Sequence, residues 1–576
     1  MIIAKSKMFA ALSGGGNYFL FSAGEKYPAK SLHSGALPLM KQDRCFCEAK
    51  AIKKAVQPCQ AGNILSLKEA ESVFGKVILV AFYNQNAIGV RYLEKALQRA
   101  GYQVKLIFFK SYHSTKPSLP TEKELALLSH MVREEKPLFV GLSVMSTLYL
   151  EAVSLVSRRL RCGKSLVVWG GVYPTMFPER ALKEADFVIR GEGEQAIVEL
   201  CRALEGKLDF SEVGNLVYRR EDQVMKNSLY PLTENLDVLS YPSIGGRNKI
   251  TIDKDKISAG DPAVRGLGYE TAASRGCPYV CSYCCAVSLK RIYKGKYVRL
   301  RSVDHVIEEL LTAKERMKHF YYIHFWDEIF SEDLDWVREF SEKYRRKIGL
   351  PFIIWAHPLK VNQEALSILV NAGLYEVIMG IQSGSKRIRK EIFHRTETDE
   401  QIIKASRRIR QAGVPYVCYD FMLQHPFESE EDIKATFRLC TRLETPFQLQ
   451  LHGLNFLPGT DIIKEAEKQG IATEKELEPI MFGSMEKQYG MYWKRNGDKD
   501  SKYWYHLIYL LQFPLMRHHA MRLAVRGQKD YAKAQRLYRM AGMFSKYHYF
   551  KKKARMLLKG WLHSMIPTVW KQWRID

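Results

Sequence analysis

The sequence predicts an α/β protein in which a doubly wound, Rossmann-like domain precedes a partial (β/α) barrel and a mostly helical, basic C-terminal region. Two series of short apolar runs alternate with amphipathic segments, a stretch rich in Pro and Gly separates them, and positive charge gathers near the end. With 576 residues and 46% hydrophobic content, the chain can bury more than one core. This composition excludes a disordered or disulfide-stapled protein.

Residues 1–70 show no sustained hydrophobic period and predict a poorly defined N-terminal extension. They contain Cys45, Cys47 and Cys59 at irregular spacing, which favours a loosely ordered segment over a second metal site. The apolar run at residues 8–12 is too short for a secretory signal, and no run approaches the length of a membrane-spanning helix. We therefore expect a cytoplasmic protein.

Residues 75–205 predict an open parallel sheet with helices on both faces. Nearly continuous apolar runs are typical of strands that are buried on both sides. They occur at 76–82, 104–109, 138–144 and 166–169, with helical patterns near 88–100, 121–135, 148–161 and 179–185. Ligands of such sheets bind beyond the carboxyl ends of the strands.

Residues 206–260 lose the helical rhythm and predict a linker with a small hairpin, because Pro231, Pro242, Gly245 and Gly246 interrupt it. A second alternating series fills residues 261–470. Its strand-like runs lie near 269–274, 321–326, 352–356, 376–381, 416–423 and 448–455. Six β-then-α units predict a complete or partial barrel, with its chemistry at the C-terminal ends of the strands.

Three cysteines follow the first barrel strand at once. Cys277, Cys281 and Cys284 lie on one tight loop, and a cubic iron–sulfur cluster ordinarily takes four protein ligands. Three thiolates therefore suggest a cluster with one iron left open for a substrate or cofactor. A four-ligand zinc site that uses Cys285 or Cys418, or chance clustering, is the alternative.

This Cys-x-x-x-Cys-x-aromatic-Cys loop resembles that of the radical S-adenosylmethionine superfamily, with Tyr283 at the aromatic position. The resemblance implies that the three thiolates hold a [4Fe–4S] cluster whose open iron binds S-adenosylmethionine, and that reductive cleavage gives a 5′-deoxyadenosyl radical. The Pro-Gly-Thr at 458–460 also resembles the family pattern. Further positions that the resemblance assigns to the cofactor are Tyr283, Asp327, Glu328, Gln382, Ser383 and Arg395. Gln424 departs from the family by replacing a glycine.

The first domain resembles the cobalamin-binding half of B12-dependent radical S-adenosylmethionine enzymes. The resemblance assigns to cobalamin the positions Asn86, Gly89, Ser143, Ser146, Gly170, Gly171, Gly191 and Glu192. Asn86 stands where related corrinoid domains have a histidine under the cobalt, and an amide nitrogen is a poor donor to metals. We therefore expect cobalamin without a histidine lower ligand. The alternatives are a helix cap at Asn84 or Asn86 and an empty, vestigial domain.

The last 76 residues carry sixteen Lys and Arg against Asp530 and Asp576, a net charge of +14. Residues 551–566 predict a basic amphipathic helix. Its expected apolar face holds Leu557, Leu558, Trp561, Leu562 and Met565, and its expected polar face holds Lys552, Lys553, Arg555 and Lys559. We favour packing of this helix on the barrel over peripheral contact with an anionic membrane at the inner face, and nucleic acid is the weakest choice.

The combined resemblance implies a cobalamin-dependent radical S-adenosylmethionine methyltransferase that uses methylcobalamin at an unactivated carbon. Oxidative cyclisation or rearrangement on the same architecture is the rival activity, and a non-catalytic corrinoid- or membrane-binding scaffold is the rival of another class. We expect a small-molecule or lipid substrate and an external electron donor of the flavodoxin or ferredoxin type. No general base, substrate identity or oligomeric state follows from the sequence.

Overall fold

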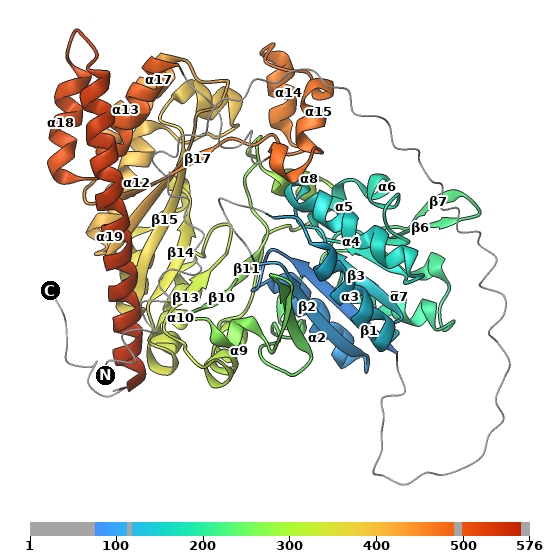
Figure 1. The fold of residues 1–576 in the computed structure, drawn as a ribbon. Coiled ribbons are helices and arrows are strands. Elements are labelled where there is room, and N and C mark those ends of the chain that lie inside the picture. The colour runs from blue at the N-terminus through green and yellow to red at the C-terminus, as the bar shows by residue number, and fades with distance from the viewer. Residues whose placement is uncertain (1–74, 112–117, 489–497, 566–576) are drawn as a thin grey trace, which may run out of the picture.

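The structure is a computed structural model that describes residues 75–111, 118–488 and 498–565. It contains two large sheets side by side, the first domain in blue and teal and the barrel in green and yellow (Figure 1). The predicted N-terminal extension, with Cys45, Cys47 and Cys59, lies outside the described residues. No helix in the described part of the chain is both long enough and apolar enough to cross a lipid bilayer.

The first domain is the doubly wound sheet that the apolar runs predict. Its parallel strands are β1 (Lys76–Phe82), β2 (Gln103–Phe109), β3 (Phe139–Ser143), β4 (Val167–Gly170) and β5 (Phe187–Ile189), in the order β5-β4-β3-β1-β2. Its helices are α2 (Ile88–Arg99), α3 (Glu122–Glu135), α4 (Leu150–Cys162), α5 (Val172–Met176), α6 (Pro178–Ala181) and α7 (Glu194–Leu204). Each sheet face has its own core, with Ile78 and Val80 on one side and Val77 and Leu79 on the other.

The segment 206–260 differs from the linker with one hairpin that we expected. It forms two hairpins, and both extend the first sheet. They consist of β6 (Leu216–Arg220) with β7 (Gln223–Lys226), and β8 (Lys249–Asp253) with β9 (Lys256–Ala259). β6 pairs with β5 and β8 pairs with β2, so the sheet has nine strands. Burial of Leu216, Val217 and Ile252 holds these edges to the core.

The second domain is a partial barrel of six parallel strands in chain order. These are β10 (Tyr269–Thr271), β13 (Ile323–Phe325), β14 (Phe352–Ala356), β15 (Leu374–Gln382), β16 (Tyr416–Leu423) and β17 (Gln448–Gly453). The helices around it are α9 (Val303–Arg316), α10 (Leu334–Lys347), α11 (Gln363–Ala372), α12 (Asp399–Gln411), α13 (Glu430–Arg442) and α14 (Asp461–Lys468). At the mouth of the barrel, near the C-terminal end of β10, lies a small antiparallel ribbon of β11 (Ser274–Arg275) and β12 (Arg299–Leu300). The helix α8 (Cys285–Arg291) lies between these two strands in the sequence.

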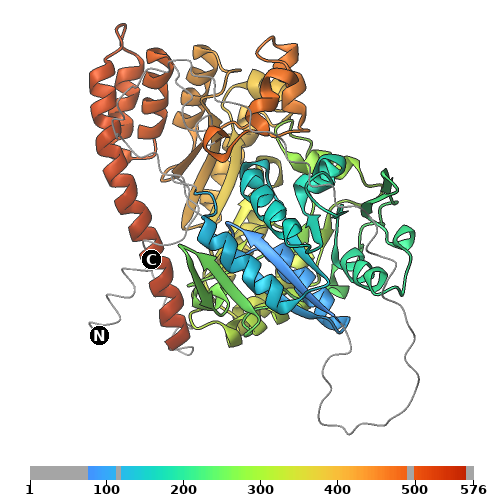
Figure 2. The ribbon, with the colours of Figure 1, turned by 45° about the vertical axis from the view of Figure 1, so that its right-hand side comes forward.

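The C-terminal region consists of α15 (Glu474–Met481), α17 (Lys499–Leu510), α18 (Pro514–Ala524) and the long helix α19 (Tyr531–Met565). α17 packs between the barrel helix α13 and α19. Both views of the ribbon place α18 and α19 on the side of the barrel away from the first domain (Figures 1 and 2).

The two faces that we predicted for residues 551–566 are wrong in detail. Lys552 and Lys553 are buried, whereas Leu558, Trp561 and Met565 are exposed. The Lys552 ammonium lies 2.6 Å from Glu376 Oε1 and 2.7 Å from Gln448 Oε1, at the N-terminal ends of β15 and β17. A buried carboxylate can thus draw a lysine into the interior.

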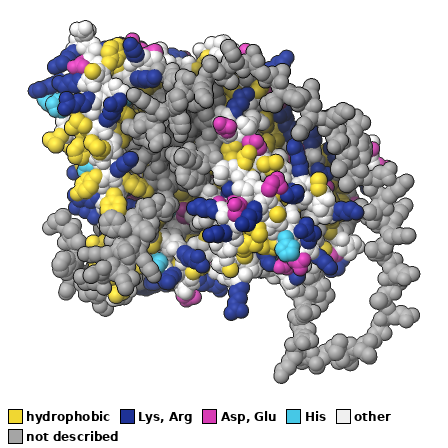
Figure 3. Space-filling model, viewed as in Figure 1, with side chains coloured by type: hydrophobic (Ala, Val, Ile, Leu, Met, Phe, Trp, Pro, Cys, Tyr) yellow, Lys and Arg dark blue, Asp and Glu magenta, His cyan; other side chains and the backbone are white. Residues whose placement is uncertain are grey.

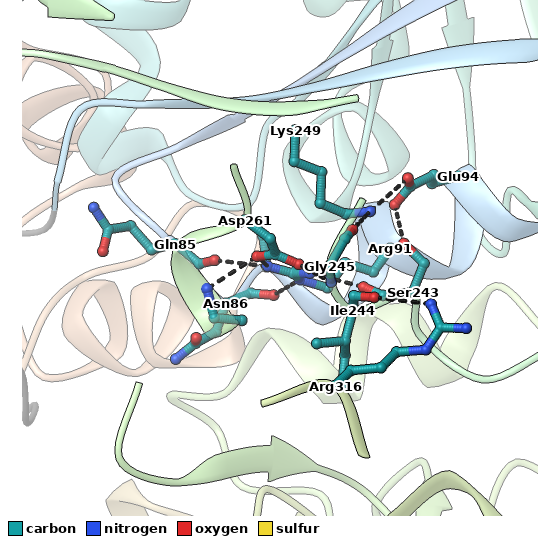
Figure 4. Close-up of polar contacts among 12 residues, drawn as sticks. Gln85, Asn86, Arg91, Glu94, Ser243, Ile244, Gly245, Lys249, Asp261 and Arg316 are labelled. Atoms are coloured by element: carbon teal, nitrogen blue, oxygen red, sulfur yellow. Dashed lines mark hydrogen bonds and ion pairs between the residues drawn. The ribbon is translucent and has the colours of Figure 1, made fainter. Parts of the chain in front are cut away.

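A buried network of charges joins the two domains (Figure 4). Arg91 of α2 makes two 2.7 Å hydrogen bonds to the carboxylate of Asp261, which leads into the barrel. One turn along α2, Glu94 accepts a 2.7 Å hydrogen bond from Lys249 of β8. All four side chains are almost fully buried. Burial opposes ionisation of Asp261, but the hydrogen bonds from Arg91 hold the pKa of this carboxyl below its ordinary value.

Loss of the Arg91 charge should destabilise the protein strongly. We expect Arg91→Met to lower the free energy of unfolding by about 3–5 kcal/mol, because Asp261 would remain buried without a partner. Arg159→Ala, which removes the exposed pair with Glu122, is the matched control and should cost about 0–1 kcal/mol. Thermal and urea unfolding at neutral pH measure both. Since the folded pKa of Asp261 is lowered, the difference should shrink as the pH falls through that pKa. Equal, small losses in both variants would contradict this assignment.

Candidate active site

The three predicted cluster cysteines lie on the loop that connects β11 to α8. Cys277 follows Arg275 of β11 by two residues, and Cys284 stands at the N-terminal cap of α8. The Cys284 amide donates a 3.1 Å hydrogen bond to the Cys281 carbonyl, which closes a tight turn. Gly276 between strand and loop has φ +95°, and a Cβ there would lie 2.4 Å from the Tyr297 carbonyl oxygen. Only glycine fits this position.

Arg395 ties the cysteine loop to the barrel. Its buried guanidinium lies 4.0 Å from the Cys281 sulfur and 3.3 Å from the Tyr283 hydroxyl, and it donates a 2.8 Å hydrogen bond to the Gly380 carbonyl. Glu397 accepts a 2.5 Å hydrogen bond from the Arg395 Nε. Arg395 thus places a fixed cation beside the Cys281 sulfur and links the cysteine loop to the end of β15. The structure thus brings together three of the predicted positions, Cys281, Tyr283 and Arg395.

Burial disfavours the free thiolate of Cys277. It raises the pKa of the Cys277 thiol to about 11, so the thiolate needs a cationic partner such as iron. Within the described ranges, no three His, Cys, Asp or Glu side chains are arranged around a single metal ion. The thiolates of a cubic cluster bind different irons rather than a single ion, so a donor set of three cysteines on one loop fits such a cluster.

The acidic turn after β13 contains two predicted cofactor residues, Asp327 and Glu328, and only Asp327 is buried. The Asp327 carboxylate accepts a 3.0 Å hydrogen bond from the Ala273 amide and another from the Ser274 hydroxyl. Asp327 therefore positions the start of the cysteine loop, and burial raises its pKa to about 6. Glu328, the next residue, is exposed.

A second group of polar side chains that could contact a cofactor lies at the turn after β15. The sequence predicts two of its residues, Gln382 and Ser383. Gln382 has φ +69°, and its buried Oε1 has no hydrogen-bond partner among the described residues. Its Nε2 lies 3.3 Å from Asp420 Oδ2, and Asp420 Oδ1 lies 2.8 Å from His452 Nε2 of β17. Ser383 is fully buried and accepts a hydrogen bond from the Ser385 amide, so it shapes the turn. Asp420 belongs to the stretch 420–426 that resembles the family, whereas His452 was not predicted, although it lies near the C-terminal end of β17.

A cavity of about 390 Å³ lies between the carboxyl ends of β1, β3, β4 and β5 and the start of the barrel. The predicted positions that line it are Gly89, Ser143, Gly170, Gly171, Gly191 and Glu192. Nothing lies within 4 Å of a Cβ built on Gly89, so the space above this residue is open. The barrel contributes Ser274, Arg275 and Arg301 to the opposite wall.

Two predicted cobalamin positions do not line this cavity. The carbonyl of Asn86 accepts a 2.6 Å hydrogen bond from Arg91, which places this residue in the network between the domains. Ser146 caps the short 3₁₀ helix Thr147–Tyr149 by accepting from the Leu148 amide, and it faces a second cavity. None of the described residues that line the first cavity is a histidine.

Glu192 holds the two walls of the cavity together. Its carboxylate accepts hydrogen bonds of 3.0 Å from Arg275 and 2.8 Å from Arg299, both on the barrel ribbon. Although burial works in the opposite direction, Arg299 and Arg275 lower the pKa of Glu192. The preceding Gly191 has φ +68°, and a Cβ there would lie 1.7 Å from the Tyr293 hydroxyl. The sequence analysis missed Arg275 and Arg299 as partners because they lie far from Glu192 in the sequence.

The second cavity, of about 440 Å³, lies beyond the ends of β16 and β17. Its walls include Ser146 and Leu148 of the first domain, Gln424 of the barrel and Tyr505 of α17. The side chain of Glu428 is buried at this cavity, and burial raises its pKa to about 8 although Tyr505 donates a 2.9 Å hydrogen bond to it. A neutral carboxylic acid at pH 7 can donate a hydrogen bond to a bound molecule.

Comparison with known families separates the same two domains. The B12 binding domain model matches residues 76–201, and the Radical SAM superfamily model matches residues 272–440. An uncharacterized methyltransferase of Pyrococcus horikoshii, PH0819, is 26% identical over 371 residues, which cover 62% of this chain and 74% of that protein. An anaerobic magnesium-protoporphyrin IX monomethyl ester cyclase of Cereibacter sphaeroides is 25% identical over 373 residues, 61% of this chain and 55% of that protein.

A solved structure shares the arrangement of domains. It is the radical S-adenosylmethionine methyltransferase TsrM from Kitasatospora setae with cobalamin and a [4Fe–4S] cluster bound, at a TM-score of 0.57 and 17% identity over 81% of this chain and 99% of that one. At this identity the match confirms the fold. The two family matches bring S-adenosylmethionine, a [4Fe–4S] cluster and cobalamin as cofactors, and the glycine-lined cavity and the cysteine loop fit them. The chain is therefore a radical S-adenosylmethionine enzyme with an N-terminal B12-binding domain.

Proposed function

We propose that this protein is a cobalamin-dependent methyltransferase that acts on an unactivated carbon of a small molecule. We assign the first cavity, of about 390 Å³, to the corrinoid and call it the corrinoid cavity. One observation carries the proposal: Ser274 and Arg275 line this cavity, and Cys277 follows Arg275 by two residues. A cofactor in the cavity and a cluster on the loop would then face one reaction space. Methyltransferases among the relatives, PH0819 and TsrM, support this reaction class.

The cofactors would supply a methyl group and a carbon-centred radical, while the protein binds and orients them. We assign Cys277, Cys281 and Cys284 as cluster ligands, with Arg395 and Tyr283 as the residues that position them. The unpartnered Gln382 Oε1 is a candidate acceptor for the amino group of S-adenosylmethionine. An external electron donor of the flavodoxin or ferredoxin type would reduce the cluster.

We propose that the cobalt has no protein nitrogen beneath it. The residue expected there, Asn86, points its carbonyl to Arg91, and the described cavity wall contains no histidine. The open space above Gly89 instead leaves room for the cofactor to approach the backbone closely.

The second cavity is our candidate for the substrate. It collects residues from the first domain, the barrel mouth and α17, as a site between two cofactors requires. An aromatic series joins it to the cluster loop, because the Phe393 ring lies 5.1 Å from Tyr283 and 5.2 Å from His425.

Methyl transfer can be tested without the substrate. We expect the anaerobically reconstituted protein, given methyl-labelled S-adenosylmethionine, cobalamin and a reductant, to release S-adenosylhomocysteine and to move the label to cobalamin. Liquid chromatography with mass spectrometry detects both. Release of 5′-deoxyadenosine with no S-adenosylhomocysteine would contradict the proposal and favour ring-forming chemistry like that of the cyclase relative.

Replacement of the loop cysteines tests the cluster ligands. Cys277→Ala, Cys281→Ala and Cys284→Ala should each lose most of the bound iron and the visible absorption of the cluster, because each removes one thiolate. Cys285→Ala is the control, since it changes the neighbouring thiol at the first residue of α8 and should keep the wild-type iron content. Normal iron in the three variants, or its loss in Cys285→Ala alone, would refute the assignment.

Gly89→Leu tests the corrinoid cavity. A leucine there should fill the open space and lower the cobalamin bound per chain at least tenfold, as measured by absorbance after gel filtration. The fold should survive, because leucine is a better helix former than glycine by up to about 1 kcal/mol. Gly542→Leu, at an equally open position of α19, should bind cobalamin normally. Undiminished binding by Gly89→Leu would place cobalamin elsewhere.

A further inference from the structure

We propose that α18 and α19 form a docking face for an anionic lipid bilayer. Apolar side chains of α19 are exposed along its length, among them Met543, Phe544, Tyr547, Leu558, Trp561 and Met565. Met543 and Met565 are 67% and 63% exposed, and Leu515 at the start of α18 is 88% exposed. Figure 3 shows hydrophobic side chains between Lys and Arg on the side of the molecule that these helices form.

The exposed apolar residues occupy a single face of α19. Positions 540, 544, 547, 558, 561 and 565 differ by three, four or eleven residues, which is the spacing of one helical face. The opposite face, with Ala541, Lys552, Met556 and Gly560, packs on the protein. A Cβ on Gly560 would lie 1.9 Å from the Tyr321 carbonyl oxygen, so the helix touches the barrel there. The apolar stripe is therefore a second face, separate from the packed one.

Positive charge surrounds this stripe, although Lys529 and Lys552 pair with carboxylates. Residues 514–565 hold thirteen Lys and Arg and a single acidic residue, Asp530. Exposed Arg522, Arg539 and Lys546 make no ion pair with a carboxylate in the described parts of the chain. Lys343 of α10, by contrast, pairs with both Asp304 and Glu339.

The combination of the two features selects an anionic bilayer as the occupant. An interfacial helix places apolar and aromatic side chains at the acyl boundary while Lys and Arg contact lipid phosphates. Nucleic acid would use the cations but leave the methionines and leucines in water. A second copy would place two strongly positive faces against each other. At 1.5 Å per residue, α19 offers a surface roughly 50 Å long, which suits a helix lying flat on a membrane.

Vesicle flotation with the full chain tests the proposal. We expect binding to vesicles of phosphatidylcholine with 30% phosphatidylglycerol, little binding to phosphatidylcholine alone, and weaker binding in 0.5 M salt. The variant Arg539→Glu/Lys546→Glu/Lys551→Glu should bind at least tenfold less, and so should Phe544→Ser/Leu558→Ser. Iron and cobalamin contents should be unchanged, because these side chains lie on the outer surface.

A matched control keeps the test specific. Lys386→Glu/Lys404→Glu/Arg410→Glu makes the same change in net charge at positions of the barrel that are also exposed, and it should bind like the wild type. Equal losses in both charge variants would overturn the assignment to this face. Absence of wild-type binding to the anionic vesicles would overturn the proposal altogether. A dimer in light scattering that Phe544→Ser/Leu558→Ser dissolves would overturn it by assigning the face to a second copy.

Discussion

The buried pair of Arg91 and Asp261 is the constraint on which the active site depends. It joins α2, which carries Gly89 at the first cavity, to the segment from which the barrel begins. The same guanidinium holds the carbonyls of Gln85 and Asn86, so the turn beside the cavity and the domain junction share one cation. Because a lone buried charge is so costly, the two domains cannot separate here without protonation or hydration of this pair.

Glu192 adds a second link at the opposite wall of the cavity. Its two arginine partners come from β11 and β12, and β11 leads directly to Cys277. A displacement of the first domain is therefore transmitted to the cysteine loop through a few hydrogen bonds. Asp327 stabilises the same loop from the barrel side, through the Ala273 amide and the Ser274 hydroxyl. The loop is thus held from both domains rather than by the barrel alone.

The alternation of apolar runs and helices predicted both parallel sheets, because buried parallel strands leave a clear local pattern. It did not predict the order of the strands, and it missed the short strand β5. The cysteine loop could also be predicted, since its three cysteines lie close together in the sequence. The sequence predicted one small hairpin in residues 206–260 but neither the second hairpin nor the extension of the first sheet by both, because exposed edge strands such as β9 contain few apolar residues. Arg91 with Asp261 and Lys552 with Glu376 join residues 170 and 176 positions apart, and no local period reports such pairs.

Lys552 gives α19 a role at the floor of the barrel. A sheet of six strands does not close on itself, and its lower end carries the polar side chains of Glu376 and Gln448. The ammonium group of Lys552 covers this end by contacting both side chains. The Tyr375 hydroxyl donates a hydrogen bond to the Lys552 carbonyl and so holds the helix backbone in place. A chain cut short before α19 would therefore leave Glu376 and Gln448 without this ammonium partner, and the N-terminal ends of β15 and β17 would be open to water.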